Sequence, residues 1–181
     1  MIERLARELA QRIDEDASPR KLICIDGPAG AGKTSLAEAL AARIPGSVMI
    51  HMDDLYDGWD SALSPDLEQR LCSEIRDPFM AGQDLSLHTY DWHEGRFRPA
   101  HTQPVGDVLI VEGVGAAQAC MREAARLTVF VEVARSTGRS RVIERDGDIS
   151  AAHIDAWQET ESAHFARDDT RAAVSLYITS D

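Results

Sequence analysis

Residues 27–34 read Gly-Pro-Ala-Gly-Ala-Gly-Lys-Thr and match the pattern G-x-x-x-x-G-K-[ST]. An apolar run, residues 22–25, precedes this stretch, and a helix-like run, residues 35–40, follows it. This is the setting that a phosphate-binding loop (P-loop) needs, because glycines let successive backbone N–H groups face a polyphosphate at the N-terminus of a helix. The motif predicts nucleotide binding through Gly27, Ala29, Gly30, Ala31, Gly32, Lys33, Thr34 and Ser35.

Two side chains of this loop have separate expected roles. Lys33 is expected to be surface-facing and to reach the β- and γ-phosphates, and the Thr34 hydroxyl is expected to hold Mg²⁺. The alternative is a glycine turn beside an ordinary surface lysine. The chain contains no asparagine, which excludes the Asn-Lys-x-Asp element that reads guanine in GTPases. The expected cofactors are therefore ATP and Mg²⁺.

Length and charge limit the possible partners. The 181 residues suffice for one domain with a core but not for two ordinary ones, so we expect residues 1–181 to form a single domain. A formal net charge of −12 argues against binding to nucleic acid. No run approaches 18 apolar residues and the N-terminal segment is too charged for a signal peptide, so we expect a cytoplasmic protein without a membrane partner. The oligomeric state stays open.

Apolar periodicity predicts the order of the elements. Helical spacing over residues 2–13 indicates an amphipathic helix at the start of the chain. Near-continuous apolar strands separated by helical stretches indicate a parallel sheet covered on both faces. We therefore predict an α/β, three-layer P-loop NTPase fold with a five-stranded parallel sheet, its strands within 22–25, 47–52, 107–113, 127–133 and 173–178. Residues 54–106, with four prolines and little strand periodicity, are the expected inserted acceptor-binding segment at the carboxyl edge of the sheet.

Two acidic residues follow predicted strands. Asp53 is expected at the end of the second strand, where its carboxylate can accept the proton of an attacking hydroxyl. Asp54 competes for this role, although strand alternation should point the two side chains to opposite sides. Glu112 follows four apolar residues, as in a Walker B strand, and is expected to bind Mg²⁺ together with Thr34. The alternative for Asp53 is a capping residue.

Arginines gather in an otherwise acidic chain. Residues 135–149 contain Arg135, Arg139, Arg141 and Arg145. They form two pairs at i, i+4, and the two arginines within each pair repel each other unless an anion is bound. We expect a lid-like segment in which Arg141 and Arg145 are the functional pair, and the alternative is a solvated helix with neighbouring acids. His51, His153 and His164 show no spacing typical of a metal site or a triad. In a late helix from about residue 150 to 167, His153, Trp157 and His164 are expected to pack.

In order and approximate spacing, five segments resemble the uridine kinase (uridine–cytidine kinase) family of P-loop kinases: residues 27–34, 52–56, 90–92, 109–113 and 141–146. The likeness extends from about residue 21 to residue 178. It implies an ATP-dependent kinase in which Asp53 is the general base for a nucleoside 5′-hydroxyl and Glu112 supports Mg²⁺. It also implies that the Tyr-Asp-Trp segment belongs to the nucleoside pocket and that the arginine-rich segment covers the phosphates. The chain departs from the family where Trp92 replaces phenylalanine and where His93 lies closer to this motif than in other members.

The acceptor is a small hydroxyl compound in this interpretation. We expect its pocket to contain Tyr90, Trp92, His93 and Arg96, with Tyr56 or Trp59 from the other end of the insert, because aromatic rings stack on planar bases. The alternative is that Tyr90 and Trp92 fill a small core. A nucleoside monophosphate kinase remains possible, since the insert contains Arg70, Arg76, Arg96 and Arg98. The same motifs also permit another small-metabolite kinase, or a regulatory module that binds ATP with little turnover.

Overall fold

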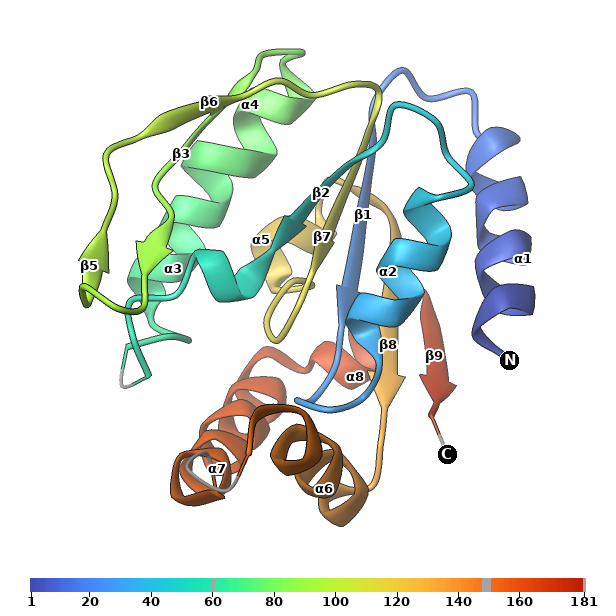
Figure 1. The fold of residues 1–181 in the computed structure, drawn as a ribbon. Coiled ribbons are helices and arrows are strands. Elements are labelled where there is room, and N and C mark those ends of the chain that lie inside the picture. The colour runs from blue at the N-terminus through green and yellow to red at the C-terminus, as the bar shows by residue number, and fades with distance from the viewer. Residues whose placement is uncertain (60, 148–150, 181) are drawn as a thin grey trace.

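The chain is built around a five-stranded parallel sheet with strand order β2-β7-β1-β8-β9 (Figure 1). A computed structural model describes residues 1–59, 61–147 and 151–180. The sheet confirms the predicted α/β architecture, and only its last strand begins later than expected because residues 170–173 form a short helix. The strands are β1 (Lys21–Asp26), β2 (Val48–His51), β7 (Val108–Glu112), β8 (Ala125–Glu132) and β9 (Leu176–Thr179).

The central strand β1 alternates between two apolar layers. Ile23 and Ile25 point to a layer shared with helices α1 (Ile2–Asp14) and α2 (Lys33–Ala41). Leu22 and Cys24 point to the opposite layer, which contains residues of the insert and of α7 (Ala151–Asp168). Because successive side chains of a strand face opposite ways, one apolar run supplies both cores. Figure 1 shows α1 and α2 on one side of the sheet, the green helical run of the insert on the other side, and α7 below the carboxyl ends of the strands.

The insert leaves the sheet at the end of β2 and returns at the start of β7. It forms a helical run, in which a π-helical turn joins two α-helical turns, and two small antiparallel sheets, β3 with β6 and β4 with β5. Strands of two or three residues are too short to show an alternating pattern, so the sequence gives little sign of them. The elements are η1 (Met52–Asp54), α3 (Pro65–Arg70), η2 (Leu71–Arg76), α4 (Asp77–Met80), β3 (Leu85–Leu87), β4 (Tyr90–Asp91), β5 (Arg96–Phe97) and β6 (His101–Gln103).

Four described helices follow β7: α5 (Ala119–Arg122), α6 (Arg135–Asp146), α7 and α8 (Thr170–Ala173). Of these, α6 and α7 lie at the carboxyl end of the sheet (Figure 1). The expected arginine-rich segment is mostly α6, and residues 148 and 149 at its end lie outside the described residues. Within the part of the chain that the structure describes, no helix has the length and apolar character needed to cross a membrane. The three cysteines are free, with Cys24 and Cys120 buried.

Helix α6 lies directly on the P-loop through a backbone contact. A Cβ atom at Gly138 would lie 2.6 Å from the carbonyl oxygen of Ala29, and a Cβ atom at Gly30 would lie 2.3 Å from the carbonyl oxygen of Gly138. Real Cβ atoms do not approach oxygen so closely, so both positions require glycine. This contact places the C-terminal half of α6 above the phosphate-binding loop.

We predict that Gly138→Ala lowers the free energy of unfolding by about 1–3 kcal/mol, because the added methyl group overpacks the contact with Ala29. Helix propensity alone predicts the opposite sign, a gain of roughly 1 kcal/mol for Gly to Ala. Urea denaturation measures the difference. Ser140→Ala, at an exposed position of the same helix, is the matched control and should change little. A Gly138→Ala variant more stable than the wild type would contradict the close contact.

Candidate active site

The P-loop adopts the conformation that its glycines allow. Gly27, Gly30 and Gly32 have φ angles of +138°, +76° and +90°, and α2 begins directly after Gly32. A side chain at Gly27 would also meet the carbonyl oxygen of Val131 in β8 at 2.1 Å. From α7, the buried carboxylate of Glu161 accepts a hydrogen bond of 2.9 Å from the backbone N–H of Ala29. The loop is therefore held by its neighbours before any ligand binds.

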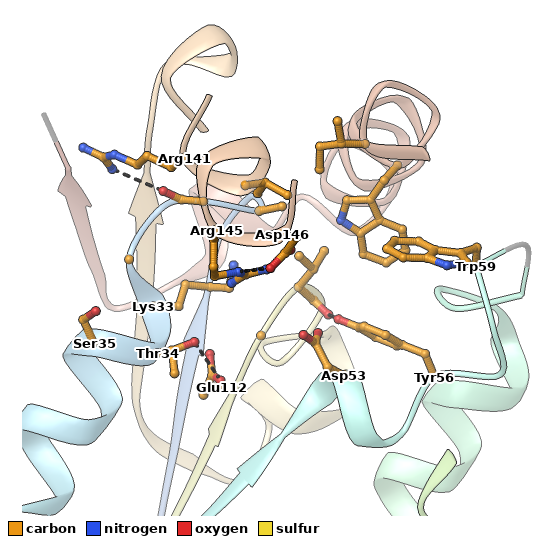
Figure 2. Close-up of a pocket in the computed structure, with 18 of the residues that line it drawn as sticks. Lys33, Thr34, Ser35, Asp53, Tyr56, Trp59, Glu112, Arg141, Arg145 and Asp146 are labelled. Atoms are coloured by element: carbon orange, nitrogen blue, oxygen red, sulfur yellow. Dashed lines mark hydrogen bonds and ion pairs between the residues drawn. The ribbon is translucent and has the colours of Figure 1, made fainter. Parts of the chain in front are cut away.

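A cavity of about 550 Å³ opens in front of this loop (Figure 2). Its walls come from the P-loop and the start of α2, from the segments after β2 and β7, and from helices α6 and α7. Figure 2 shows Lys33, Thr34 and Glu112 at one end, Asp53 near the middle and the aromatic residues Tyr56 and Trp59 at the other. Phosphate-binding groups and aromatic groups thus share one space.

Lys33 is buried, with 7% of its surface exposed, and not surface-facing as expected. Its Nζ donates a hydrogen bond of 2.8 Å to the carbonyl oxygen of Pro28, across the P-loop. Loss of solvent lowers the pKa of Lys33, while nearby carboxylates, with Asp26 and Glu112 foremost, act in the opposite direction. Lys33 is buried because α6 and α7 cover the loop, and the spacing of residues along the chain does not reveal this cover.

Glu112 is a buried carboxylate at the end of β7. Its Oε1 accepts a hydrogen bond of 3.1 Å from Thr34 Oγ1 and lies 2.6 Å from His51 Nδ1. The parallel pairing of β2 with β7 sets His51 opposite Glu112, so this contact depends on strand register and has no signal in the sequence. Thr34 and Glu112 offer oxygen donors of the kind that Mg²⁺ takes. Within the described residues, no group of three or more His, Cys, Asp or Glu side chains is arranged to hold a metal ion.

Asp53 lies in a helical turn and not on a strand as expected. Strand β2 ends at His51, and η1 carries both Asp53 and Asp54. Asp53 lines the cavity, whereas Asp54 is not among the lining residues. Loss of solvent within the cavity raises the pKa of Asp53, the charge of Lys33 lowers it, and Glu112 raises it again. The turn geometry, and not strand alternation, therefore sets which of the two acids lines the cavity.

The arginines of α6 divide into two pairs. Arg135 and Arg139 bind α7, through Glu159 at 2.6 Å and Asp155 at 2.6 Å. Arg141 and Arg145 line the cavity instead.

Within the cavity pair, Arg141 donates to the carbonyl oxygen of Gly30 at 3.2 Å and to Ser180 Oγ at 3.0 Å. Arg145 is paired with Asp146, and Figure 2 shows it reaching from α6 toward Lys33. The structure thus separates arginines that join two helices from arginines that face the loop.

Four aromatic rings form the wall opposite the P-loop. Trp59 lies 5.4 Å from Trp92 and 5.7 Å from Trp157 between ring centroids, and Tyr56 lies 5.4 Å from Trp157. Trp157 was expected only to pack, yet it lines the cavity. The signal that could have found it is the polar Glu161 four residues later on the same helix face, beside the P-loop. Trp92 Nε1 also donates to the backbone oxygen of Asp53 at 3.0 Å.

Three residues expected in the acceptor pocket lie outside the cavity lining: Tyr90, His93 and Arg96. Asp91 accepts hydrogen bonds from the N–H groups of His93 and Glu94, which closes a turn whose side chains are exposed. Arg96 pairs with Glu94 in the same turn. Tyr90 packs behind Trp92, with ring centroids 5.1 Å apart. Tyr90 therefore supports the wall without facing the cavity.

The chain is similar to known P-loop kinases. It is 28% identical to uridine-cytidine kinase C of Dictyostelium discoideum over 119 residues, which cover 61% of this chain and 26% of that protein. A possible uridine kinase from Bacillus stearothermophilus matches with a TM-score of 0.69 and 18% identity over 96% of both chains. A putative fructose transport system kinase from Silicibacter sp. matches with a TM-score of 0.70 and 17% identity over 98% of both chains. At these identities the solved structures establish the fold alone, and no family model matches the chain.

We predict that Lys33→Met is at least as stable as the wild type at neutral pH. Because the pKa of Lys33 is lowered, its charged form costs stability at and below the folded-state pKa, and this cost is lost as the pH rises from that value to the ordinary value of 10.5. The difference in the free energy of unfolding, variant minus wild type, should therefore shrink with increasing alkaline pH. Urea denaturation across the alkaline range measures it. A variant that is less stable than the wild type at pH 7, or whose difference from the wild type does not change across the alkaline range, contradicts this account of the lysine.

Proposed function

We propose that this divergent relative of uridine-cytidine kinase C is an ATP-dependent phosphotransferase that moves the γ-phosphoryl group of ATP to a hydroxyl of a small uncharged molecule, most suitably a nucleoside. The observation that carries the proposal is the shared cavity, which contains the P-loop, the Asp53 carboxylate and an aromatic wall. Phosphoryl transfer depends mainly on positioning and electrostatics in such an enclosed space. In this proposal residues 1–181 act as a single kinase domain.

The loop end of the cavity fits Mg·ATP. The backbone N–H groups of the P-loop and Lys33 would hold the phosphates, and the oxygens of Thr34 and Glu112 would hold the ion. When bound, Mg·ATP supplies the phosphoryl group, with the ion offsetting charge on the phosphate oxygens. Lys33 must exchange its present acceptor, the carbonyl of Pro28, for a phosphate oxygen. Arg145, which already reaches over Lys33, adds a second positive charge (Figure 2).

Asp53 is the proposed general base. As the acceptor oxygen bonds to phosphorus and the bond to the departing nucleoside diphosphate breaks, the hydroxyl proton passes to Asp53. A raised pKa makes a carboxylate a better proton acceptor, and the surroundings of Asp53 raise it. The hydrogen bond from Trp92 to the backbone of Asp53 supports this role, because it ties the base to the aromatic wall where the acceptor would lie.

We predict that Asp53→Asn lowers kcat by about 10²–10⁴-fold, the usual effect of losing a general base, while the Kd for ATP changes little. Asp54→Asn, which alters the neighbouring acid outside the cavity lining, is the matched control and should keep most of the activity. Lys33→Met should raise the Kd for ATP, so it distinguishes a defect in ATP binding from the defect in proton transfer expected for Asp53→Asn. Steady-state kinetics and calorimetric ATP titration measure both quantities. A loss of this size in Asp54→Asn, with Asp53→Asn harmless, would move the proposed base to Asp54.

An uncharged acceptor fits this cavity better than a nucleoside monophosphate. A phosphate on the acceptor needs a positive group at the aromatic end, and the four insert arginines are engaged elsewhere. Arg70 donates to the carbonyl of Leu55, and Arg76 pairs with Asp77. Arg96 pairs with Glu94, and Arg98 with Asp91. None of the four is among the residues that line the cavity.

A screen of hydroxyl acceptors with γ-labelled ATP tests the function directly. Nucleosides, nucleoside monophosphates and small sugar-like alcohols form the three acceptor groups, with Asp53→Asn as the blank. Transfer to nucleosides or other uncharged alcohols supports the proposal. Preferred transfer to monophosphates instead identifies a nucleoside monophosphate kinase. ATP binding without transfer to any acceptor identifies a regulatory module and ends the kinase proposal.

We predict that Trp59→Ala raises the KM for the acceptor roughly tenfold or more, since stacking of a base on an aromatic side chain contributes about 1–3 kcal/mol. The Trp59 side chain is 48% exposed, so its loss should cost little stability. Tyr177→Ala, which removes an equally exposed aromatic ring on β9, is the matched control and should leave KM unchanged. Kinetics with varied acceptor and thermal denaturation distinguish the two effects. An unchanged acceptor KM in Trp59→Ala would contradict the stacking wall.

A further inference from the structure

Asp26 is a fully buried carboxylate at the end of the central strand β1. Its Oδ1 accepts hydrogen bonds from the backbone N–H groups of Gly27, at 2.7 Å, and Gly115, at 2.8 Å. Its Oδ2 accepts a third, from the N–H of Ala117, at 2.8 Å. Asp26 is not among the residues that line the cavity. A buried charge is costly unless its oxygens are well paired, and here three donors share two oxygens.

The three donors belong to two loops with different tasks. Gly27 opens the P-loop, which faces the donor end of the cavity. Gly115 and Ala117 lie in the loop after β7, together with Val114, whose carbonyl accepts a hydrogen bond of 2.8 Å from the Tyr56 hydroxyl. Val114 and Tyr56 both line the cavity at its acceptor end. One carboxylate therefore bonds both the P-loop, at the donor end of the cavity, and the loop after β7, at its acceptor end.

We propose that Asp26 is a positioning residue that fixes the P-loop and the loop after β7 relative to each other and so aligns the phosphate cradle with the acceptor wall. The inference deepens the proposed function and rests on it for its kinetic consequence. Its structural part stands alone, because the bonds of Asp26 do not depend on what the cavity binds. Misplacement by about 1 Å of groups that hold two substrates typically costs roughly 10²-fold in rate.

The ionised form of Asp26 is the one that this geometry uses. A protonated carboxyl would place an O–H among N–H donors, where at least one hydrogen bond must be lost. Burial raises the pKa of Asp26 from 3.8 to about 6, and its three N–H partners and the charge of Lys33 oppose the rise. Other titratable groups around Asp26 and its two loops are Glu161 and His164 from α7, Cys24 from β1, and Tyr56; the His164 ring lies beside Gly115, and burial lowers its pKa to about 4. Protonation below about pH 6 should therefore loosen both loops together.

Backbone amide NMR of the wild-type chain tests the bonds without reference to activity. The N–H resonances of Gly27, Gly115 and Ala117 should shift together with a common midpoint near pH 6, because all three N–H groups sense the charge of the same carboxylate. The Asp53→Asn variant should keep this shared transition, because the three N–H groups bond Asp26 and none of them bonds Asp53, although the pKa of Asp53, like that of Glu161, is also raised. Three amides that titrate separately, or not at all between pH 4 and 8, would overturn the proposal.

Kinetics of Asp26→Asn test the positioning role. The asparagine has nearly the same shape, but its NH₂ replaces one oxygen and faces an N–H donor. We expect kcat/KM to fall by about 10²-fold for ATP and for the acceptor alike, and the shared amide transition to vanish. Thr170→Val is the matched control: Thr170 is fully buried and donates to Asp168 at 2.8 Å, away from the cavity lining.

The outcomes separate the two proposals. If Asp26→Asn loses no more activity than Thr170→Val at equal stability, the positioning role is wrong. If Asp26→Asn does not fold, the joint titration of the wild-type amides still decides whether one carboxylate holds both loops. If the wild type transfers phosphate to no acceptor, the proposed function fails, and the amide titration again decides the structural claim by itself.

Discussion

The P-loop passes between β8 and α6 with no room for a side chain at Gly27 or Gly30, because backbone oxygens of Val131 and Gly138 occupy the space. This close approach fixes three things at once. It holds the loop open toward the cavity, it sets α6 directly above the loop, and it brings Arg141 and Arg145 to the cavity edge. Two buried carboxylates, Asp26 and Glu161, then accept hydrogen bonds from the loop N–H groups of Gly27 and Ala29. The site depends on this contact because every charged group in it is placed relative to the loop.

Features that depend on local pattern could be predicted from the sequence. The P-loop is a contiguous motif, and the strands that precede Asp53 and Glu112 are continuous apolar runs, so the five-stranded sheet followed from periodicity and order. Arg141 and Arg145 were separated from Arg135 and Arg139 in the expectation, and the structure places the first pair on the cavity and the second against α7. Spacing places each pair on one face of the helix, but both pairs have the same i, i+4 spacing, so spacing alone does not tell which pair meets the cavity.

Features that depend on contacts between distant segments could not be predicted. The pairing of His51 with Glu112 follows from the register of β2 against β7, which no single strand reveals. The burial of Lys33 follows from helices that arrive more than a hundred residues later. His93 and Arg96 were assigned to the pocket by proximity to an aromatic motif, but a tight turn closed by Asp91 carries them away. Trp92 therefore lines the cavity, whereas His93 and Arg96, close to it in the sequence, do not.

The aromatic wall contains all three tryptophans of the chain, Trp59, Trp92 and Trp157. Indole emission from this protein therefore arises entirely from the aromatic end of one cavity, and no tryptophan elsewhere contributes background. Trp59 and Trp92 are partly open to solvent, whereas Trp157 is buried, so their spectra should differ in their response to water-borne quenchers. The fold has in this sense its own optical reporter: a molecule that enters the cavity displaces water from two indoles at once, without any label attached to the chain.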